Sequence, residues 1–179
     1  MTWREDALVA AKEANPRESC GLLVCLKGKP YYWACKNLAE DQEDQFIIDP
    51  IDYAAAEDAG EVLAIIHSHP QMPPTPSQAD LVSCEKSGLP WHILTPNGLW
   101  GKCEPSGYEA PLIGRSWVWG VQDCWTLVRD YYNEKGIELK DWDRPNNPME
   151  FVINPIFDRC WRSTGFRELK EEEVLEEGD

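Results

Sequence analysis

Apolar and polar positions in the first part of the chain follow helix-like and then strand-like spacing. The segment WREDALVAAKEAN, residues 3–15, has apolar residues at helical spacing, and Pro16 follows it, which predicts a first helix. Two apolar and aromatic runs, residues 20–26 and 30–35, flank the turn-like Lys-Gly-Lys at residues 27–29. This arrangement predicts a β-hairpin.

The next segments continue the mixture of helices and strands. Asp49, Pro50 and the alanine-rich stretch after them open a second predicted helix, which Gly60 ends. The continuous apolar run VLAII, residues 62–66, predicts a buried strand. Further elements are predicted downstream: a helix over residues 77–86, and strands over residues 91–96 and 98–104. Together they predict one domain of α/β (α+β) class over residues 1–104.

A second module is predicted after a linker. Residues 105–115, PSGYEAPLIGR, carry two prolines and two glycines and form the best linker candidate. In the module at residues 116–179 the pattern predicts a helix over residues 123–135, a turn-rich loop DWDRPNNP, and a short helix over residues 155–162. The acidic end KEEEVLEEGD, residues 170–179, is typical of a solvated surface helix or a frayed tail.

Composition excludes several classes of partner. The chain has 179 residues, with 17 Lys and Arg against 32 Asp and Glu, and its net charge is -15. Such a charge argues against nucleic acid and anionic membranes. We expect no signal peptide and no membrane insertion, because the first residues are charged and no apolar run reaches the length of a bilayer span. The seven scattered cysteines lack a C-x-x-C pair and indicate reduced thiols.

The stretch HSHPQMPPTPSQAD holds the candidate chemistry of the first domain. His67 and His69 follow the buried strand, and alternation along a strand turns both imidazoles to the same side. A proline-rich loop then leads to Ser77 and Asp80, which open a helix. Two nitrogens and one carboxylate oxygen suit zinc and leave a fourth position for water.

Simpler interpretations exist for each of these residues. His67 and His69 could be strand residues with satisfied hydrogen bonds, and the S-x-x-D pattern of Ser77 and Asp80 is also a helix N-cap. Glu18, just before the first predicted strand, could be an ordinary solvated carboxylate.

Taken together, the residues resemble the signature of the JAMM/MPN+ metalloproteases, H-x-H-x7-S-x2-D with an upstream glutamate. The resemblance implies a JAMM/MPN-like mixed sheet flanked by helices. It also implies that His67, His69 and Asp80 bind Zn2+, that Glu18 activates a water, and that Ser77 stabilises the oxyanion during hydrolysis of amide or isopeptide bonds.

Cys124 is the candidate nucleophile of the second module. Asp123 can cap a helix that starts at Cys124, and a helix N-terminus favours a thiolate. The alternative is that Cys124 belongs to the core, since it shares a helix face with Val128, Tyr131 and Tyr132.

The stretch IGRSWVWGVQDCWTLVRDYY is similar to the start of the NlpC/P60 cysteine peptidases. This resemblance implies a papain-like α+β fold in which Cys124 is the nucleophile. That family needs a histidine after a downstream Gly-Asp, whereas no histidine follows His92 and the sequence stops at Gly178-Asp179. We therefore expect a partial module, truncated before its histidine, in which Cys124 is not catalytically competent.

The order of the two modules resembles the tail-tip assembly proteins of lambda-like siphophages. This resemblance implies a peptide or peptidoglycan substrate, other phage tail-tip proteins as partners, and a location in the host cytoplasm during assembly and then at the virion tail tip. Two alternatives stay open. One is a structural tail component with vestigial sites, and the other is a cellular JAMM isopeptidase that acts on ubiquitin-like modifiers.

Overall fold

A five-stranded mixed sheet organises the first half of the chain, residues 2–104. The computed structural model describes residues 2–146, 148–170 and 172–174, so most of the predicted acidic tail lies outside the described residues. The strand order is β2-β1-β3-β4-β5, and all neighbours are antiparallel except β3 and β4, which are parallel. The strands are β1 (Cys20–Leu26), β2 (Lys29–Cys35), β3 (Glu61–Ser68), β4 (Trp91–Leu94) and β5 (Trp100–Cys103).

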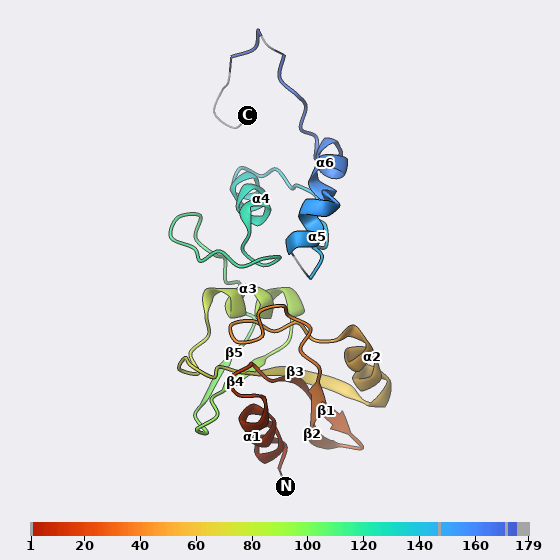
Figure 1. The fold of residues 1–179 in the computed structure, drawn as a ribbon, viewed down its shortest axis with the longest axis vertical. Coiled ribbons are helices and arrows are strands. Elements are labelled where there is room, and N and C mark those ends of the chain that lie inside the picture. Colours follow the sequence, from red (N-terminus) through yellow and green to blue (C-terminus); the bar gives the residue numbers. More distant parts are fainter. Residues whose placement is uncertain (1, 147, 171, 175–179) are drawn as a thin grey trace.

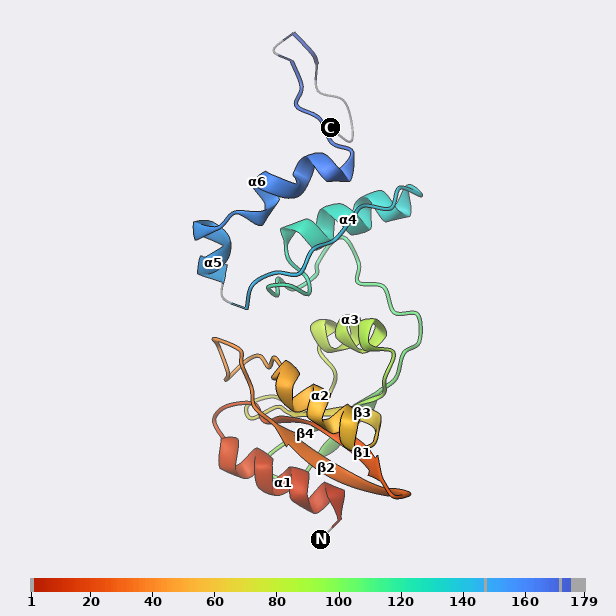
Figure 2. The same ribbon diagram turned by 90° about the vertical axis from the view of Figure 1, so that its right-hand side faces the viewer.

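Helices cover both faces of this sheet. Helix α1 (Trp3–Ala14) lies on one face, while α2 (Pro50–Ala59) and α3 (Gln78–Ser87) lie on the other (Figures 1 and 2). Side chains at neighbouring positions of a strand point to opposite faces of the sheet. Ile66 therefore packs in the hydrophobic cluster under α1, and Ile65 packs in the cluster under α2 and α3. The predicted mixed α+β class and the helix-flanked sheet are confirmed.

The second half, residues 116–174 as described, is helical. It contains α4 (Cys124–Glu134), α5 (Pro148–Ile153), α6 (Ile156–Cys160) and a 3-10 turn at Trp161–Thr164, with α4 lying beside α5 and α6 (Figures 1 and 2). Aromatic rings join them: Trp125 contacts Trp142 and Phe157 at centroid distances of 5.4 and 5.5 Å, and Trp119 meets Phe151 at 5.3 Å. No helix in the described ranges is long and apolar enough to cross a membrane.

The structure corrects several details of the predicted elements. Helix α5 was not predicted, because six residues after a turn-rich loop are too few to show a helical period. The predicted helix over residues 155–162 is α6 followed by the 3-10 turn. The interpretation of Cys124 as a core residue is wrong, since its side chain is exposed while the adjacent Trp125 and Thr126 are buried.

An ion-pair network holds the second half together where its apolar core is small. The Arg144 guanidinium donates from Nε and Nη2 to the Asp123 carboxylate at 2.9 and 3.1 Å, and it also pairs with Asp141. Asp123 is the N-cap of α4 and accepts from the Thr126 backbone N–H at 2.9 Å. Burial opposes ionisation of Asp123, but the Arg144 contacts outweigh it and hold the pKa of Asp123 below its usual range.

We predict that Arg144→Ala destabilises the second half selectively. Removing the arginine leaves the buried Asp123 carboxylate without its cation, which costs about 3 kcal/mol of the free energy of unfolding. Urea denaturation followed by tryptophan fluorescence measures the loss. The matched control is Arg162→Ala, because Arg162 is exposed, pairs with the exposed Glu168 and lies over the Trp161 ring, contacts that contribute little to stability. Equal losses in both variants would contradict the assignment.

Candidate metal centre

Strand β3 delivers the two histidines of the HSHP stretch to one point. His67 is the penultimate residue of the strand and His69 follows it directly. Their Nε2 atoms lie 3.1 Å apart, so the rings converge on the same side. Ser68, between them, points to the other face. The geometry of the pair is therefore the one that strand alternation predicts.

Pairing between β1 and β3 brings Glu18 to the same place. Cys20 lies opposite His67 in the antiparallel register. One residue further on, Ser68 donates its backbone N–H to the Ser19 carbonyl at 2.9 Å, and Ser19 N–H donates to the Ser68 hydroxyl at 2.8 Å. Glu18, the next residue on this chain, consequently lies beside the histidine pair and is only 5% exposed. The interpretation of Glu18 as an ordinary solvated carboxylate is wrong.

The first turn of α3 supplies the carboxylate. The Asp80 N–H donates to the Ser77 hydroxyl at 3.1 Å, and the Ser77 N–H donates to Asp80 Oδ2 at 2.7 Å, which completes a capping box. Asp80 Oδ1 also lies 3.3 Å from His67 Nε2, and Oδ2 lies 3.4 Å from His69 Nε2. The helix-cap interpretation is therefore correct but incomplete, because the same carboxylate also faces both imidazoles.

The donor set of His67, His69 and Asp80 fits a zinc ion. One ligand atom from each residue lies within 4.8 Å of the others, and all three side chains are buried. His69 Nδ1 is 2.9 Å from the Pro73 carbonyl, which accepts only if that nitrogen carries the proton. This contact assigns a tautomer in which His69 Nε2 keeps its lone pair for a metal. We call these three residues the metal centre.

Burial and mutual contact set the protonation of the centre. Burial dominates at His67 and lowers its pKa, whereas contacts with Asp80 and Pro73 outweigh burial at His69 and raise its pKa. Burial opposes ionisation of Asp80, but its contacts with the two imidazoles hold its pKa well below the usual range. Burial raises the pKa of Glu18 to about 8.

Two aromatic rings fix the orientation of His67. Phe46 stacks on the imidazole at a centroid distance of 4.6 Å, and Trp91 meets it edge-on at 5.5 Å. These rings do the positioning, because His67 Nδ1 has no hydrogen-bond partner among the described residues. Sequence analysis missed both aromatic residues: neither lies in the signature stretch, and only the tertiary fold brings them to His67.

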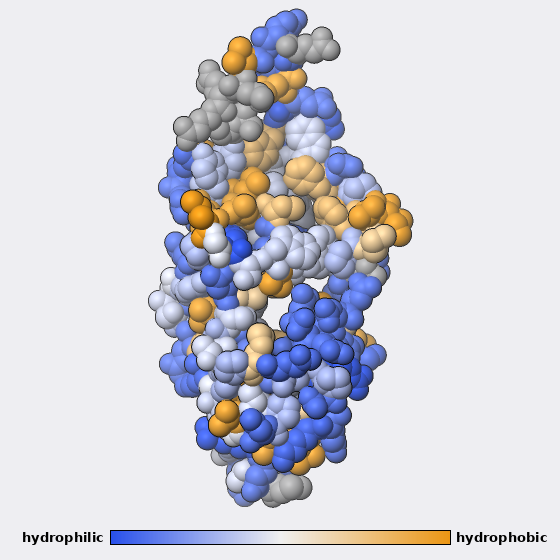
Figure 3. All heavy atoms as spheres, turned by 60° about the vertical axis from the view of Figure 1, so that its left-hand side comes forward, coloured by the Kyte–Doolittle hydropathy of each residue, from blue (hydrophilic) through white to orange (hydrophobic). Residues whose placement is uncertain are grey.

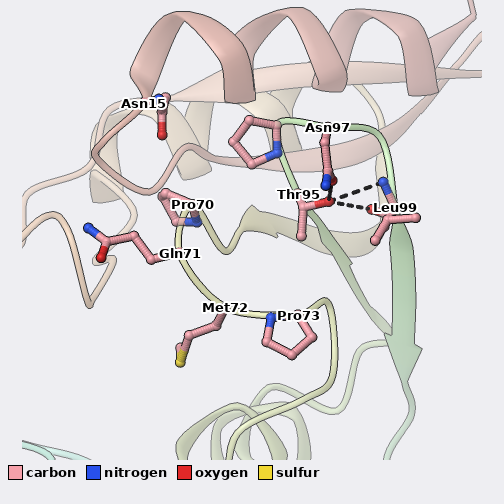
Figure 4. A pocket seen from close by; sticks show the side chains of 9 residues that line it. Asn15, Pro70, Gln71, Met72, Pro73, Thr95, Asn97 and Leu99 are labelled. Atoms are coloured by element: carbon pink, nitrogen blue, oxygen red, sulfur yellow. Dashed lines mark hydrogen bonds between the residues drawn. The ribbon is translucent and has the colours of Figure 1, made fainter.

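The loop after His69 separates two hollows of the surface. One hollow of about 360 Å³ is lined by Pro70, Gln71, Met72 and Pro73 together with the turn between β4 and β5 (Figure 4). Another, of about 600 Å³, is lined by Glu18 and Ser77. No predicted site residue lines the hollow of Figure 4, whereas Glu18 and Ser77 line the larger hollow, called here the cleft.

Cys124 lies apart from the metal centre. It starts α4 in the second half, whereas all three histidines of the chain belong to the first half. The third histidine, His92, is on β4 and packs against Trp3 at 5.2 Å. No described contact joins a histidine to Cys124, and the expectation that Cys124 is not catalytically competent in this chain stays a prediction.

Two of the solved structures that this chain matches come from Desulfitobacterium hafniense and Archaeoglobus fulgidus. A protein from Desulfitobacterium hafniense is 23% identical, with a TM-score of 0.42, and the match covers 57% of this chain and 86% of that one. A JAB1/MPN domain protein from Archaeoglobus fulgidus is 24% identical, with a TM-score of 0.39, and the match covers 62% of this chain and 95% of that one.

Sequence comparison is more specific. Residues 3–117 match the family of prokaryotic homologs of the JAB domain. Tail tip assembly protein K of Escherichia phage N15 is 41% identical over 169 residues, which are 92% of this chain and 69% of that protein. The protein of the same name from Escherichia phage lambda is 38% identical over 101 residues, 56% of this chain and 48% of its own length. The chain therefore belongs to the family of phage tail tip assembly protein K and carries a domain of the prokaryotic JAB family.

Proposed function

We propose that this chain is a tail tip assembly protein whose first half is a zinc-dependent peptidase that hydrolyses amide or isopeptide bonds. The observation that carries the proposal is the convergence of His67, His69 and Asp80 on one point, with the buried Glu18 carboxylate beside them at the end of an open cleft. Zinc, when bound, supplies a Lewis acid that activates water and polarises a carbonyl group.

The residues of the chain have distinct roles in the proposed reaction. Glu18 takes a proton from the attacking water and returns it to the leaving amine, a task that its buried position beside the histidine pair allows. The Ser77 hydroxyl accepts from the Asp80 N–H, so its own proton is available to a carbonyl oxygen in the cleft. Asp80 is held by the Ser77 backbone, which fixes it toward the histidines.

The wider setting of the reaction comes from the family. The names of the relatives point to assembly at the phage tail tip, with other tail-tip proteins as partners. We propose cell-wall peptide cross-links or a tail protein as substrate. The division into domains at residues 1–104, 105–115 and 116–179 and the NlpC/P60 nature of the second half stay predictions, since the family match ends at residue 117.

A structural role without hydrolysis is the second candidate. It is favoured by membership in a family named for assembly. The two candidates differ in one outcome, because a vestigial site leaves wall peptides and tail proteins intact even when the metal is bound.

We predict that the purified chain binds about one zinc ion, at the metal centre. His67→Ala and Asp80→Ala should remove almost all of it, because each change takes away one of three converging ligands. Elemental analysis after dialysis against zinc measures the content. His92→Ala is the matched control, since His92 lies away from the centre and should leave the zinc in place. Equal zinc in all variants would refute the assignment of ligands.

Glu18→Gln is expected to retain zinc and to lower the rate of hydrolysis by about 10²- to 10⁴-fold, because it removes the group that moves the proton. Mass spectrometry of new amino termini in purified peptidoglycan peptides and tail proteins measures the rate. The control Glu13→Gln changes an exposed glutamate of α1 and should hydrolyse at the parent rate. Full activity of Glu18→Gln would exclude its proposed role, and no hydrolysis by the parent chain would favour the structural candidate.

Stability should also depend on pH through Glu18. Its pKa of about 8 in the fold lies above the ordinary 4.5, so the buried carboxyl contributes stability fully below pH 4.5 and loses it as pH rises toward 8. With a chelator present, the free energy of unfolding of the parent should therefore fall relative to that of Glu18→Gln as the pH rises from 4.5 to about 8. Urea denaturation over the pH series measures the difference, and Glu13→Gln should follow the parent. A constant difference between parent and Glu18→Gln would show that the carboxyl is not buried.

A further inference from the structure

The cleft in front of the metal centre is built by both halves of the chain. Its volume of about 600 Å³ is in the range of sites that hold small molecules and peptide segments. Glu18 and Ser77 line it, and so does an acidic loop, residues 40–45. The segment from Trp117 to Trp119 lines it from the second half. Figure 3 shows the molecule hollowed between the sheet-bearing half and the helical half.

Asp41 and Asp44 of the acidic loop give their side of the cleft a negative charge. Glu40, Asp41 and Asp44 line the cleft and are exposed. Among the described residues, neither the Asp41 nor the Asp44 carboxylate has an ion-pair partner, although both act electrostatically on Glu18. The Glu18 side chain also lines the cleft, is 95% buried and accepts no hydrogen bond from the described residues. The Asp41 and Asp44 carboxylates are therefore open to a cation on a bound segment.

Tryptophan rings line the cleft from the second half. Trp117 is 62% exposed, although it is one of the largest apolar side chains of the molecule. Trp119 is fixed by its indole N–H, which donates to the Pro145 carbonyl at 2.7 Å, and the two rings lie 6.3 Å apart. An exposed indole beside a fixed one presents a surface on which the methylene groups of a long side chain can pack.

Contacts with α3 hold these rings near the metal centre. The Ser116 backbone N–H donates to Gln78 Oε1 at 3.0 Å, one residue before Trp117. At the other end of α3, the Glu85 carboxylate accepts from the backbone N–H groups of Ser106 and Tyr108 at 2.6 and 3.0 Å. The helix that carries Asp80 therefore also anchors the segment leading to the tryptophans.

We propose that the cleft selects a peptide segment with a lysine or arginine side chain beside the bond presented to the metal centre. The cationic head group lies against Asp41 and Asp44, and the methylene chain packs on Trp117. This specificity rests on the proposed function for the reaction, but the binding it describes can be measured without hydrolysis. A neutral or acidic segment lacks the matching charge.

The test compares two peptides that differ only in the cation. The probes are acetyl-Ala-Ala-Lys-Ala-Ala-amide and its norleucine counterpart, each with the same neutral fluorophore, and binding to the full zinc-supplied chain is followed by fluorescence anisotropy. The Glu18→Gln background prevents turnover. We expect the lysine peptide to bind about fivefold more tightly at low salt, and the preference to shrink at about 0.5 M salt, because exposed charges are screened.

Matched variants locate the preference. Asp41→Asn with Asp44→Asn should abolish the preference for the lysine peptide, whereas Glu57→Gln with Asp58→Asn, the same change in charge on exposed positions of α2, should keep it. Trp117→Ala should weaken the binding of both peptides severalfold, and Trp161→Ala should leave the binding of both unchanged.

Three outcomes would overturn the proposal: equal binding of the two peptides, a preference that survives removal of Asp41 and Asp44, or no binding of either peptide. Hydrolysis by the parent chain is measured separately. A chain that prefers the lysine peptide but cleaves no substrate would keep this inference and refute the proposed peptidase.

Discussion

The antiparallel register between β1 and β3 is the constraint on which the site depends. It sets Cys20 opposite His67, and everything beyond that pair follows from strand geometry. Glu18 must then lie beside the histidine pair, although 49 positions separate Ser19 from Ser68 along the chain. A shift by one residue would turn Glu18 to the opposite face and separate it from the imidazoles. The pairing of these two strands therefore brings Glu18 and the histidines together.

A parallel strand pair adds the remaining ligand. Because β3 and β4 run parallel, the chain must cross over between them, and α3 makes that crossover on the face to which His67 points. The loop of residues 70–76 brings the first turn of α3 back over the end of β3. Asp80 thus reaches the histidines from a different element, which gives the centre ligands from a strand and a helix.

Much of this was predictable from local patterns, and the exceptions share a physical cause. The hairpin, the helix that Ser77 caps and the convergence of His67 and His69 follow from spacing alone. The stacking of Phe46 on His67 and the docking of the second half on α3 depend on tertiary contacts that leave no periodic signal. Helix α5 was missed because its six residues are shorter than two turns.

The capping box of α3 also bears on whether the protein or the proposed metal holds the site in place. The Ser77 backbone holds Asp80, aromatic rings hold His67 and the Pro73 carbonyl holds His69, so protein contacts position all three residues. A zinc finger, in contrast, depends on its ion for folding. Here the same protein contacts that hold these side chains also join the strand to the helix, so the proposed metal would serve the reaction and not the building of the fold.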